Sequence, residues 1–376
     1  MRNILNVNSE FPRYWKHRRK DQSILGMVQG SGCCCKVCEA SYLCYTRGME
    51  KRRILILSLT YCALFVATHF VNKYVLSVLK FQYPTIFQGW QTLVGFLMLS
   101  LLVQTKHLPP LLEDNTRTEI ALWLPGMIFF VLSIYSGSRA LSKLPIPVFL
   151  SLHNLVIVIS CTANLVLNRK LTSVFSYAML MILIITSVAI GKSDPLFVMD
   201  GYVWMCVHVL STGALGIYSK LMRGRLKLDS SDRLYCNYLY SVIVLTPFSY
   251  LSGDALEAVN YPYLYFSEFY MGCIMSGVFG VFLSINFIRL QESDMDSSYI
   301  STITGAAKII TSLLSLLFFD IQLTGSHSFW LLINHLAAVV CKDSSGLIDV
   351  RHRGGLVHLT KQNAHTKEYI RVPASS

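Results

Sequence analysis

The sequence has 376 residues, and its composition is that of a protein embedded in a lipid bilayer. Hydrophobic residues make up 53% of the chain and charged residues only 14%, and the mean hydropathy is +0.47. A soluble domain needs about a quarter of its residues charged to cover its surface, so this composition excludes a soluble globular protein. The formal net charge of +12, taken alone, would also fit a nucleic-acid-binding protein.

The first segment, residues 1–50, is polar and basic and lacks the apolar core of a secretory signal. We expect it to form a disordered N-terminal extension. The role of its cysteines stays open between palmitoylation near a membrane entry point and, for Cys35 and Cys38, part of a zinc site. No second pair of matching spacing follows, which favours palmitoylation. The cysteines are Cys33, Cys34, Cys35, Cys38 and Cys44.

Residues 51–341 form a series of apolar blocks that predicts an all-α, polytopic membrane domain. The blocks Ile54–Val71, Leu144–Asn168 and Leu171–Gly191 contain no Asp, Glu, Lys or Arg. At about 1.5 Å per residue, each block can cross about 30 Å of hydrocarbon. Residues 342–376 are polar, and we expect them to form a disordered cytosolic tail. We expect about ten spans, near residues 54–79, 84–105, 120–138, 145–167, 173–190, 200–221, 234–251, 266–288, 298–319 and 328–341.

The basic residues lie mainly on one side of this predicted topology. With a cytosolic N-terminus, Lys73 and Lys308 fall within spans, and most other Lys and Arg residues fall in cytosolic segments. The basic residues of the lumenal loops are Lys80, Arg139, Lys143 and Lys192. This asymmetry follows the positive-inside rule, so we expect both termini in the cytosol. The positive charge therefore indicates topology, and we expect no nucleic-acid partner.

Short correspondences five spans apart indicate an internal repeat. Lys73 follows Phe70-Val-Asn at the end of the first span, and Lys220 follows Ile217-Tyr-Ser at the end of the sixth. An odd number of spans per half inverts the second half relative to the first, as in many secondary transporters. We therefore expect two inverted five-helix repeats with a site between them near the membrane midplane.

Lys308 is the first candidate site residue, because an ionisable side chain in the middle of a span is costly and usually functional. It lies near Gly305, where the missing side chain would let a ligand or a helix approach the backbone closely. No predicted span contains an Asp or Glu at mid-membrane depth, so an anionic substrate would bring the missing negative charge. The alternative is a lysine bonded to helix carbonyls beside a water-filled cavity.

Two polar residues of the fourth span, His153 and Asn154, fall at a depth similar to that of Lys308. This correspondence favours a phosphate contact for them. Lys73 could either bind substrate or extend to the lumenal interface, and the sequence does not separate these two roles. The remaining intramembrane histidines are expected to be polar groups in helix packing: His69, His208 and His335.

The absence of membrane carboxylates also favours exchange of one anion for another over proton or sodium symport. No Walker A sequence is present, so an ATP-driven pump is not expected. We expect no enzyme activity, no cofactor and no bound metal. The competing interpretation, a membrane enzyme, would depend on Asp294 and Asp296 beside Glu292, a group that a solvated loop explains more simply.

Four stretches of the chain carry a family resemblance: Asn72–Ser77, Gly137–Leu155, Leu234–Asn237 and Thr304–Asp320. In these residues the chain resembles the nucleotide-sugar transporters of the drug/metabolite transporter superfamily, in particular their GDP-mannose-transporter-like branch. The resemblance implies ten helices in inverted repeats and a Golgi or related membrane. It also implies exchange of a cytosolic nucleotide sugar for a lumenal nucleoside monophosphate, so these molecules and the bilayer are the expected partners. Whether the chain forms a homodimer stays open.

The resemblance also implies residue roles, with Lys308 and His153 at the diphosphate and Tyr235 and Asn237 near the base. GDP-mannose carriers have Phe-Tyr-Asn-Asn where this chain has Leu-Tyr-Cys-Asn, and Gly-Ala-Leu-Asn-Lys where it has Thr-Gly-Ala-Ala-Lys. The loss of a base-reading amide at Cys236 should weaken selection for guanine. We therefore expect exchange of UDP-N-acetylglucosamine for UMP, with exchange of GDP-mannose for GMP as the alternative.

The last apolar stretch, Ser328–Cys341, is short for a membrane span. If it does not cross the membrane, the C-terminus would be lumenal and transport would be in doubt. A non-transporting membrane protein is therefore a further alternative.

Overall fold

The computed structural model describes residues 35–108, 111–112, 117–168, 174–293 and 295–341. Within these ranges the chain forms helices and their connections and no strand, which confirms the predicted all-α class. The predicted tail 342–376, Asp294 and most of the predicted N-terminal extension lie outside the described residues. The first described helix, from Cys35, includes the end of that extension, and no proline interrupts the sequence between Cys35 and Ile54.

The described helices include seven candidate membrane spans, which are long and apolar enough to cross a bilayer. The elements in chain order are α2 (Cys35–Lys73), the π-helix η1 (Tyr74–Val78), α3 (Pro84–Gln104), α4 (Arg117–Lys143), α5 (Ile146–His153), α6 (Leu155–Asn168), α7 (Val174–Ser193), α8 (Met199–Leu221), α9 (Ser230–Leu251), α10 (Asp254–Ala258), α11 (Ser267–Glu292), α12 (Ser297–Phe318) and α13 (Gly325–Val340). The seven candidates are α2 with η1 from Lys51, α3, α4, α5 with α6 to Leu167, α7, α11, and α12 from Ser298. The protein is therefore a multi-pass membrane protein.

Three further helices, α8, α9 and α13, are not among these seven candidates. α13 has only 16 residues, and α8 and α9 carry more polar and aromatic side chains. Each nevertheless packs along one of the candidate spans: α8 on α4, α9 on α3 and α13 on α7. Ten membrane spans and two inverted repeats therefore stay predictions, since seven candidate spans are found among the described residues.

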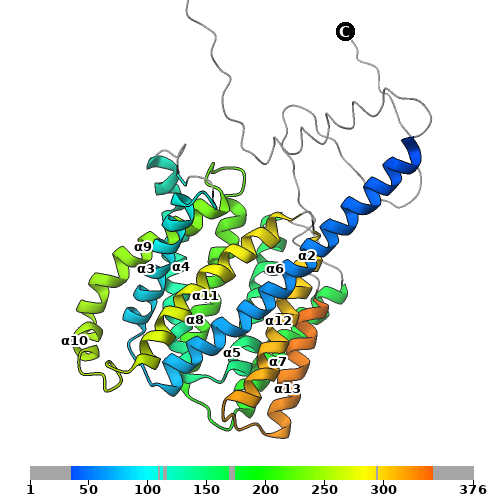
Figure 1. The fold of residues 1–376 in the computed structure, drawn as a ribbon. Helices are drawn as coiled ribbons and strands as arrows, with labels where there is room; N and C mark the ends of the chain where they lie inside the picture. The colour runs from blue at the N-terminus through cyan, green and yellow to red at the C-terminus, as the bar shows by residue number, and fades with distance from the viewer. Residues whose placement is uncertain (1–34, 109–110, 113–116, 169–173, 294, 342–376) are drawn as a thin grey trace, which may run out of the picture.

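The helices lie side by side in one bundle (Figure 1). α3 and α9 form one end of the bundle and α7 and α13 the other, while α2, α4, α8, α11 and α12 lie between them. Large apolar side chains are exposed along the outer helices, as a surface in contact with lipid requires. Examples are Leu59 on α2, Leu97 on α3, Ile185 on α7 and Leu313 on α12.

The fourth predicted span is interrupted in its middle, at Asn154. α5 ends at His153 and α6 begins at Leu155. The backbone N–H of Asn154 donates to the carbonyl of Ser151 at 3.0 Å, and its own carbonyl accepts from Ile157 N–H at 3.0 Å. Asn154 keeps helical dihedral angles (φ −64°, ψ −18°) and both of its backbone groups are paired, so the interruption is a tightened turn and the span continues through it.

The largest group of buried apolar side chains surrounds this break. It joins α2, α5, α8 and α12 and includes Tyr61, Phe149, Met205 and Ile303. Since close-packed side chains allow little movement, this packing holds the four helices at fixed distances around the interrupted span.

Candidate substrate site

Lys308 extends from the middle of α12 to the break between α5 and α6. Its Nζ donates a hydrogen bond of 2.8 Å to Asn154 Oδ1 and lies 3.1 Å from His153 Nδ1. The structure thus brings together three residues that the sequence predicts as substrate-binding, although 154 positions separate Asn154 from Lys308. In the described part of the chain the partners of the ammonium group are neutral side chains, and no carboxylate is bound to it.

The contact with Lys308 also fixes the protonation state of His153. An ammonium group can only donate, so His153 Nδ1 must present its lone pair and the ring hydrogen must be on Nε2. His153 is therefore neutral and offers an Nε2–H donor. The two contacts use two of the three N–H groups of Lys308, which leaves one for a ligand.

The side-chain amide of Asn154 ties the break to two further helices. Asn154 Nδ2 donates to Asn334 Oδ1 on α13 at 3.0 Å. Asn334 Nδ2 in turn donates to Thr186 Oγ1 at 2.9 Å and lies 3.2 Å from Ser187 Oγ, both on α7. Asn154 and Asn334 are 1% and 0% exposed. Because every polar end in this network has a partner, Asn154 Oδ1 is held toward Lys308.

Two histidines that the sequence assigned to helix packing lie at the same site. The ring of His208 on α8 is 5.4 Å from the ring of His153 and 5.3 Å from that of Phe149. The ring of His69 on α2 is 6.4 Å from that of Phe149 on the other side. Both histidines lie close enough to Lys308 to interact with its charge. The signal that could have identified them is their polarity within otherwise apolar spans.

His335 and Gly305 belong to the contact between α12 and its neighbours. His335 Nε2 lies 3.1 Å from both Ser151 Oγ and Ser312 Oγ, in the packing role expected from the sequence. A side chain at Gly305 would place its Cβ 2.8 Å from Val339 Cγ2 on α13. The close approach that Gly305 permits in this structure is therefore that of α13.

Tyr235 and Asn237, the residues expected near the base, lie on α9. The ring of Tyr235 is 5.2 Å from that of Phe96 on α3. Asn237 is buried, and its Oδ1 accepts a hydrogen bond of 3.0 Å from Trp123 Nε1 on α4. The partners that the structure gives these two residues thus belong to α3 and α4, and it does not join them to the Lys308 group. Cys236 between them is buried beside Trp123.

Lys73, the remaining predicted site residue, is the last residue of α2, and its side chain reaches the end of α4. It is buried, and its Nζ donates to the carbonyls of Leu141 at 2.9 Å and Leu144 at 2.8 Å. The last carbonyls of a helix lack intrahelical partners and attract cations. Lys73 therefore caps the C-terminal end of α4, and in this structure its side chain is buried and bonded there rather than to the Lys308 group.

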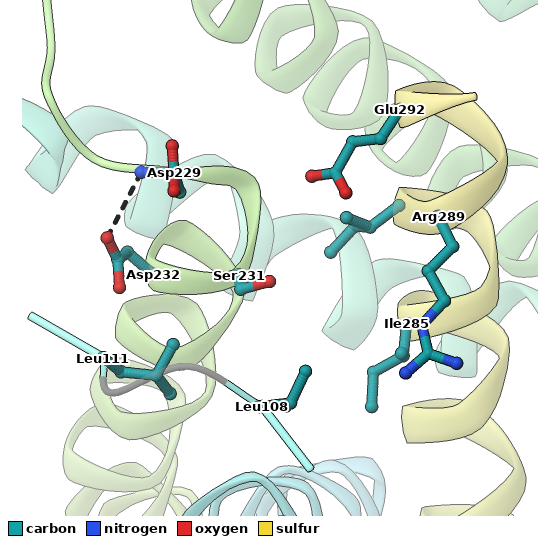
Figure 2. A pocket seen from close by; sticks show the side chains of 9 residues that line it. Leu108, Leu111, Asp229, Ser231, Asp232, Ile285, Arg289 and Glu292 are labelled. Atoms are coloured by element: carbon teal, nitrogen blue, oxygen red, sulfur yellow. Dashed lines mark hydrogen bonds between the residues drawn. The ribbon is translucent and has the colours of Figure 1, made fainter. Parts of the chain in front are cut away.

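A separate pocket of about 240 Å³ lies between the start of α9 and the end of α11 (Figure 2). Figure 2 shows Arg289 and Glu292 projecting from α11, opposite Asp229 and Ser231. Asp232 also lines it, and its Oδ2 accepts from the backbone N–H of Asp229 at 3.2 Å in a capping box. Glu292 therefore belongs to a pocket of mixed charge. Among the described residues no group of three or more metal-ligating side chains is present.

The fold and the site fit a membrane transporter, because several helices of spanning length surround a lysine to which no carboxylate of the described residues is bound. Comparison with known proteins gives the family: the chain belongs to the nucleotide-sugar transporters. It is 39% identical over 282 residues to the UDP-N-acetylglucosamine transporter TMEM241 homolog of Xenopus laevis, which covers 75% of this chain and 94% of the relative. It is 38% identical over 276 residues to the UDP-N-acetylglucosamine transporter TMEM241 of Mus musculus, which covers 73% of this chain and 91% of the relative.

More distant relatives agree with this assignment, and a solved structure resembles the fold. The chain is 25% identical over 305 residues to GDP-mannose transporter 1 of Neosartorya fischeri, with 75% of this chain and 78% of the relative covered. A crystal structure with 11% identity matches with a TM-score of 0.52 over 76% of this chain and 95% of that chain, a likeness of fold alone. No family model matches the chain. The predicted resemblance to nucleotide-sugar transporters is confirmed, and the two relatives of higher identity are forms of transmembrane protein 241. These relatives are transporters and not enzymes.

Proposed function

We propose that this chain is a Golgi antiporter that carries UDP-N-acetylglucosamine from the cytosol to the lumen in exchange for UMP. Support for the substrate comes from the relatives with 39% and 38% identity, which are named as UDP-N-acetylglucosamine transporters. The structural observation that supports an anionic substrate is the environment of the Lys308 ammonium group. Among the described residues, its hydrogen-bond partners are neutral side chains. A nucleotide sugar would bring the negative charge that this site lacks.

The diphosphate would bind where donors converge. Lys308 has one N–H group in reserve and His153 offers Nε2–H, and phosphate oxygens accept from both. Hydrogen bonds to charged groups contribute about 1.5–3 kcal/mol each, which is enough to give a selective anion site. The amide network from Asn154 to Asn334 supports this role, because a site already in its binding geometry loses less entropy when the ligand binds.

Exchange, and not uniport, follows from the charge of the empty site. A carrier that changes conformation without a ligand would enclose the positive charge of Lys308 without an anion, and an unpaired buried charge is costly. A nucleoside monophosphate would bind the same donors and remove that cost on the return. The proposed inverted repeats would then move against each other around a fixed site.

The C-terminal helix supports a transporting protein over a non-transporting one. α13 is short, but it contributes Asn334 and His335 to the polar contacts around the site and packs along α7. The excess of basic residues in the segments predicted as cytosolic supports an N-terminus in the cytosol. A homodimer stays an open proposal.

GDP-mannose with GMP is the second candidate pair, favoured by the relatives near 25% identity that are named as GDP-mannose transporters. We rank it lower because the relatives of higher identity bear the UDP-N-acetylglucosamine name. This chain also has Cys236 where GDP-mannose carriers have an asparagine, so it lacks an amide that could bind guanine. In either case we propose that Tyr235 lies near the base.

The two candidates are separated by an exchange assay in liposomes that contain the purified full chain. Vesicles preloaded with UMP, with GMP or with buffer alone receive radiolabelled UDP-N-acetylglucosamine or GDP-mannose outside. The proposal predicts uptake of UDP-N-acetylglucosamine that is stimulated by internal UMP. Uptake of GDP-mannose stimulated by internal GMP would reverse the base assignment, and no exchange with either pair would contradict the proposed function.

A further inference from the structure

Three imidazole rings from three helices surround Lys308, and hydrogen bonds fix the proton of each. His69 Nδ1 on α2 lies 2.8 Å from the carbonyl oxygen of Phe65, and His208 Nδ1 on α8 lies 2.9 Å from that of Ser133. A carbonyl only accepts, so both Nδ1 atoms carry the hydrogen. While these two rings are neutral, each Nε2 has a lone pair and no hydrogen. His153 has the opposite arrangement, because its Nδ1 accepts from Lys308.

The lone pairs on His69 and His208 do not suit a phosphate ligand. A phosphate oxygen is an acceptor, so it is repelled by an Nε2 that is also an acceptor. A proton on Nε2 converts the ring to an imidazolium, which donates to the oxygen and adds a positive charge beside it. A bound anion therefore favours protonation of Nε2 of His69 and Nε2 of His208, the two ring nitrogens that lack a hydrogen.

The surroundings of the rings make this protonation depend on the ligand. The titratable groups that interact with these rings are bases: Lys308 on α12, which also interacts with His335 on α13, and His153 on α5. On α4 the ring of His208 lies against the Ser133 carbonyl and the bare backbone of Gly137, neither of which is titratable. With no carboxylate facing the rings among the described residues, the charge of Lys308 opposes a further proton in the empty site. A bound dianion reverses the sign of that field.

We propose that His69 and His208 take up protons from solvent when a nucleotide sugar binds at Lys308, so that substrate binding and proton binding are coupled. The inference rests on the proposed function, because it requires an anionic ligand at this site. Each proton is held as an Nε2–H that donates to a phosphate oxygen and returns to solvent when the ligand leaves. The affinity for the ligand then increases as the pH falls, by up to about tenfold per pH unit for each proton taken up.

Isothermal titration calorimetry of the purified full chain with UDP-N-acetylglucosamine measures this coupling directly. The titration is repeated at one pH near neutral in buffers that differ in ionisation enthalpy, so the slope of the observed heat gives the number of protons taken up. Each phosphate of this ligand has a single ionisable group that is already charged at neutral pH, so protons taken up belong to the protein. The inference predicts an uptake of about one proton or more per ligand.

Two variants test the assignment to these residues. His69→Asn and His208→Asn each keep a side-chain donor for the carbonyl partner but cannot titrate, so each lowers the proton uptake and the double variant removes most of it. His107→Gln is the matched control, because His107 is exposed beyond the end of α3 and its loss leaves the uptake unchanged. Thermal unfolding of each variant confirms that it is folded before it is titrated.

The outcomes separate this inference from the proposed function. Binding with the same heat in every buffer would contradict proton coupling while leaving nucleotide-sugar binding intact. An undiminished proton uptake in the folded double variant would contradict the assignment to His69 and His208. If the wild-type chain binds neither UDP-N-acetylglucosamine nor GDP-mannose, the proposed function itself fails, and the inference fails with it.

Discussion

Asn154 Oδ1 accepts a hydrogen bond of 2.8 Å from Lys308 Nζ, and this contact connects the break between α5 and α6 to the middle of α12. Both ends of the Asn154 amide are engaged, since its nitrogen donates to Asn334. A flipped amide would set donor against donor at Lys308 and acceptor against acceptor at Asn334, so the side chain has one orientation. The position of the charge in the membrane interior is therefore determined by an uncharged network that joins the break to α7 and α13.

Removing Asn334 should destabilise the protein and loosen the site. In Asn334→Leu the amide nitrogen of Asn154 and the hydroxyls of Thr186 and Ser187 lose a partner in a buried region. An unsatisfied buried polar group costs about 1–3 kcal/mol, so we expect a clearly lower midpoint of thermal unfolding. Asn260→Leu, at an exposed position, serves as the control. Equal midpoints for the two variants would show that the network carries no stability.

Gly305→Ala should destabilise the contact between α12 and α13. The added Cβ would lie 2.8 Å from Val339 Cγ2, and the stiff, branched valine can move little inside a helix. Overpacking of this kind costs about 1–3 kcal/mol of the free energy of unfolding. The measurement is thermal unfolding in detergent, and Val339→Ala in the same chain should recover a large part of the loss.

Gly216→Ala is the matched control for that substitution. Gly216 lies within α8 with open space around its Cα, so an added methyl group meets no neighbour. Alanine is the better helix former by about 1 kcal/mol, and we expect this variant to unfold at the same temperature or higher. A similar destabilisation at both positions, or no recovery in the double variant, would contradict the packing role of Gly305.

Lys73→Met should lower stability and leave substrate affinity nearly unchanged. The substitution removes the donor for the carbonyls of Leu141 and Leu144 at the end of α4. We expect a loss of about 1–3 kcal/mol in the free energy of unfolding, since those buried acceptors lose a charged partner. Equilibrium binding of labelled nucleotide sugar, measured below the unfolding temperature, checks the second half of the prediction. A large loss of affinity with unchanged stability would restore Lys73 as a substrate residue.

The class of the protein and the centre of its site could be predicted from the sequence for physical reasons. Long blocks without charge have one stable environment, the bilayer, and a lysine within such a block is too costly to be incidental. These facts identified Lys308, and its depth in the predicted topology pointed to His153 and Asn154. The structure confirms that these three side chains meet.

Other features depend on which way a side chain faces, and an apolar run does not reveal this. The break at Asn154 was not expected, because the residues around it read as one continuous span. Gly305 faces α13. His69 and His208 lie close enough to Lys308 to interact with its charge. In a soluble helix the polar stripe would mark the outward face, whereas here lipid-facing and buried faces are both apolar and leave no periodic signal.

The exchange activity of one substitution at Lys308 tests the central claim most directly. Initial uptake of labelled UDP-N-acetylglucosamine is measured in liposomes with and without internal UMP, for the wild-type chain, Lys308→Gln and the exposed control Lys220→Gln. We predict that internal UMP stimulates uptake by the wild type and the control, and that Lys308→Gln loses about 10- to 100-fold in uptake, because a charged hydrogen bond contributes about 1.5–3 kcal/mol. UMP-stimulated uptake that persists at the wild-type rate in Lys308→Gln would contradict the claim that this lysine binds the substrate.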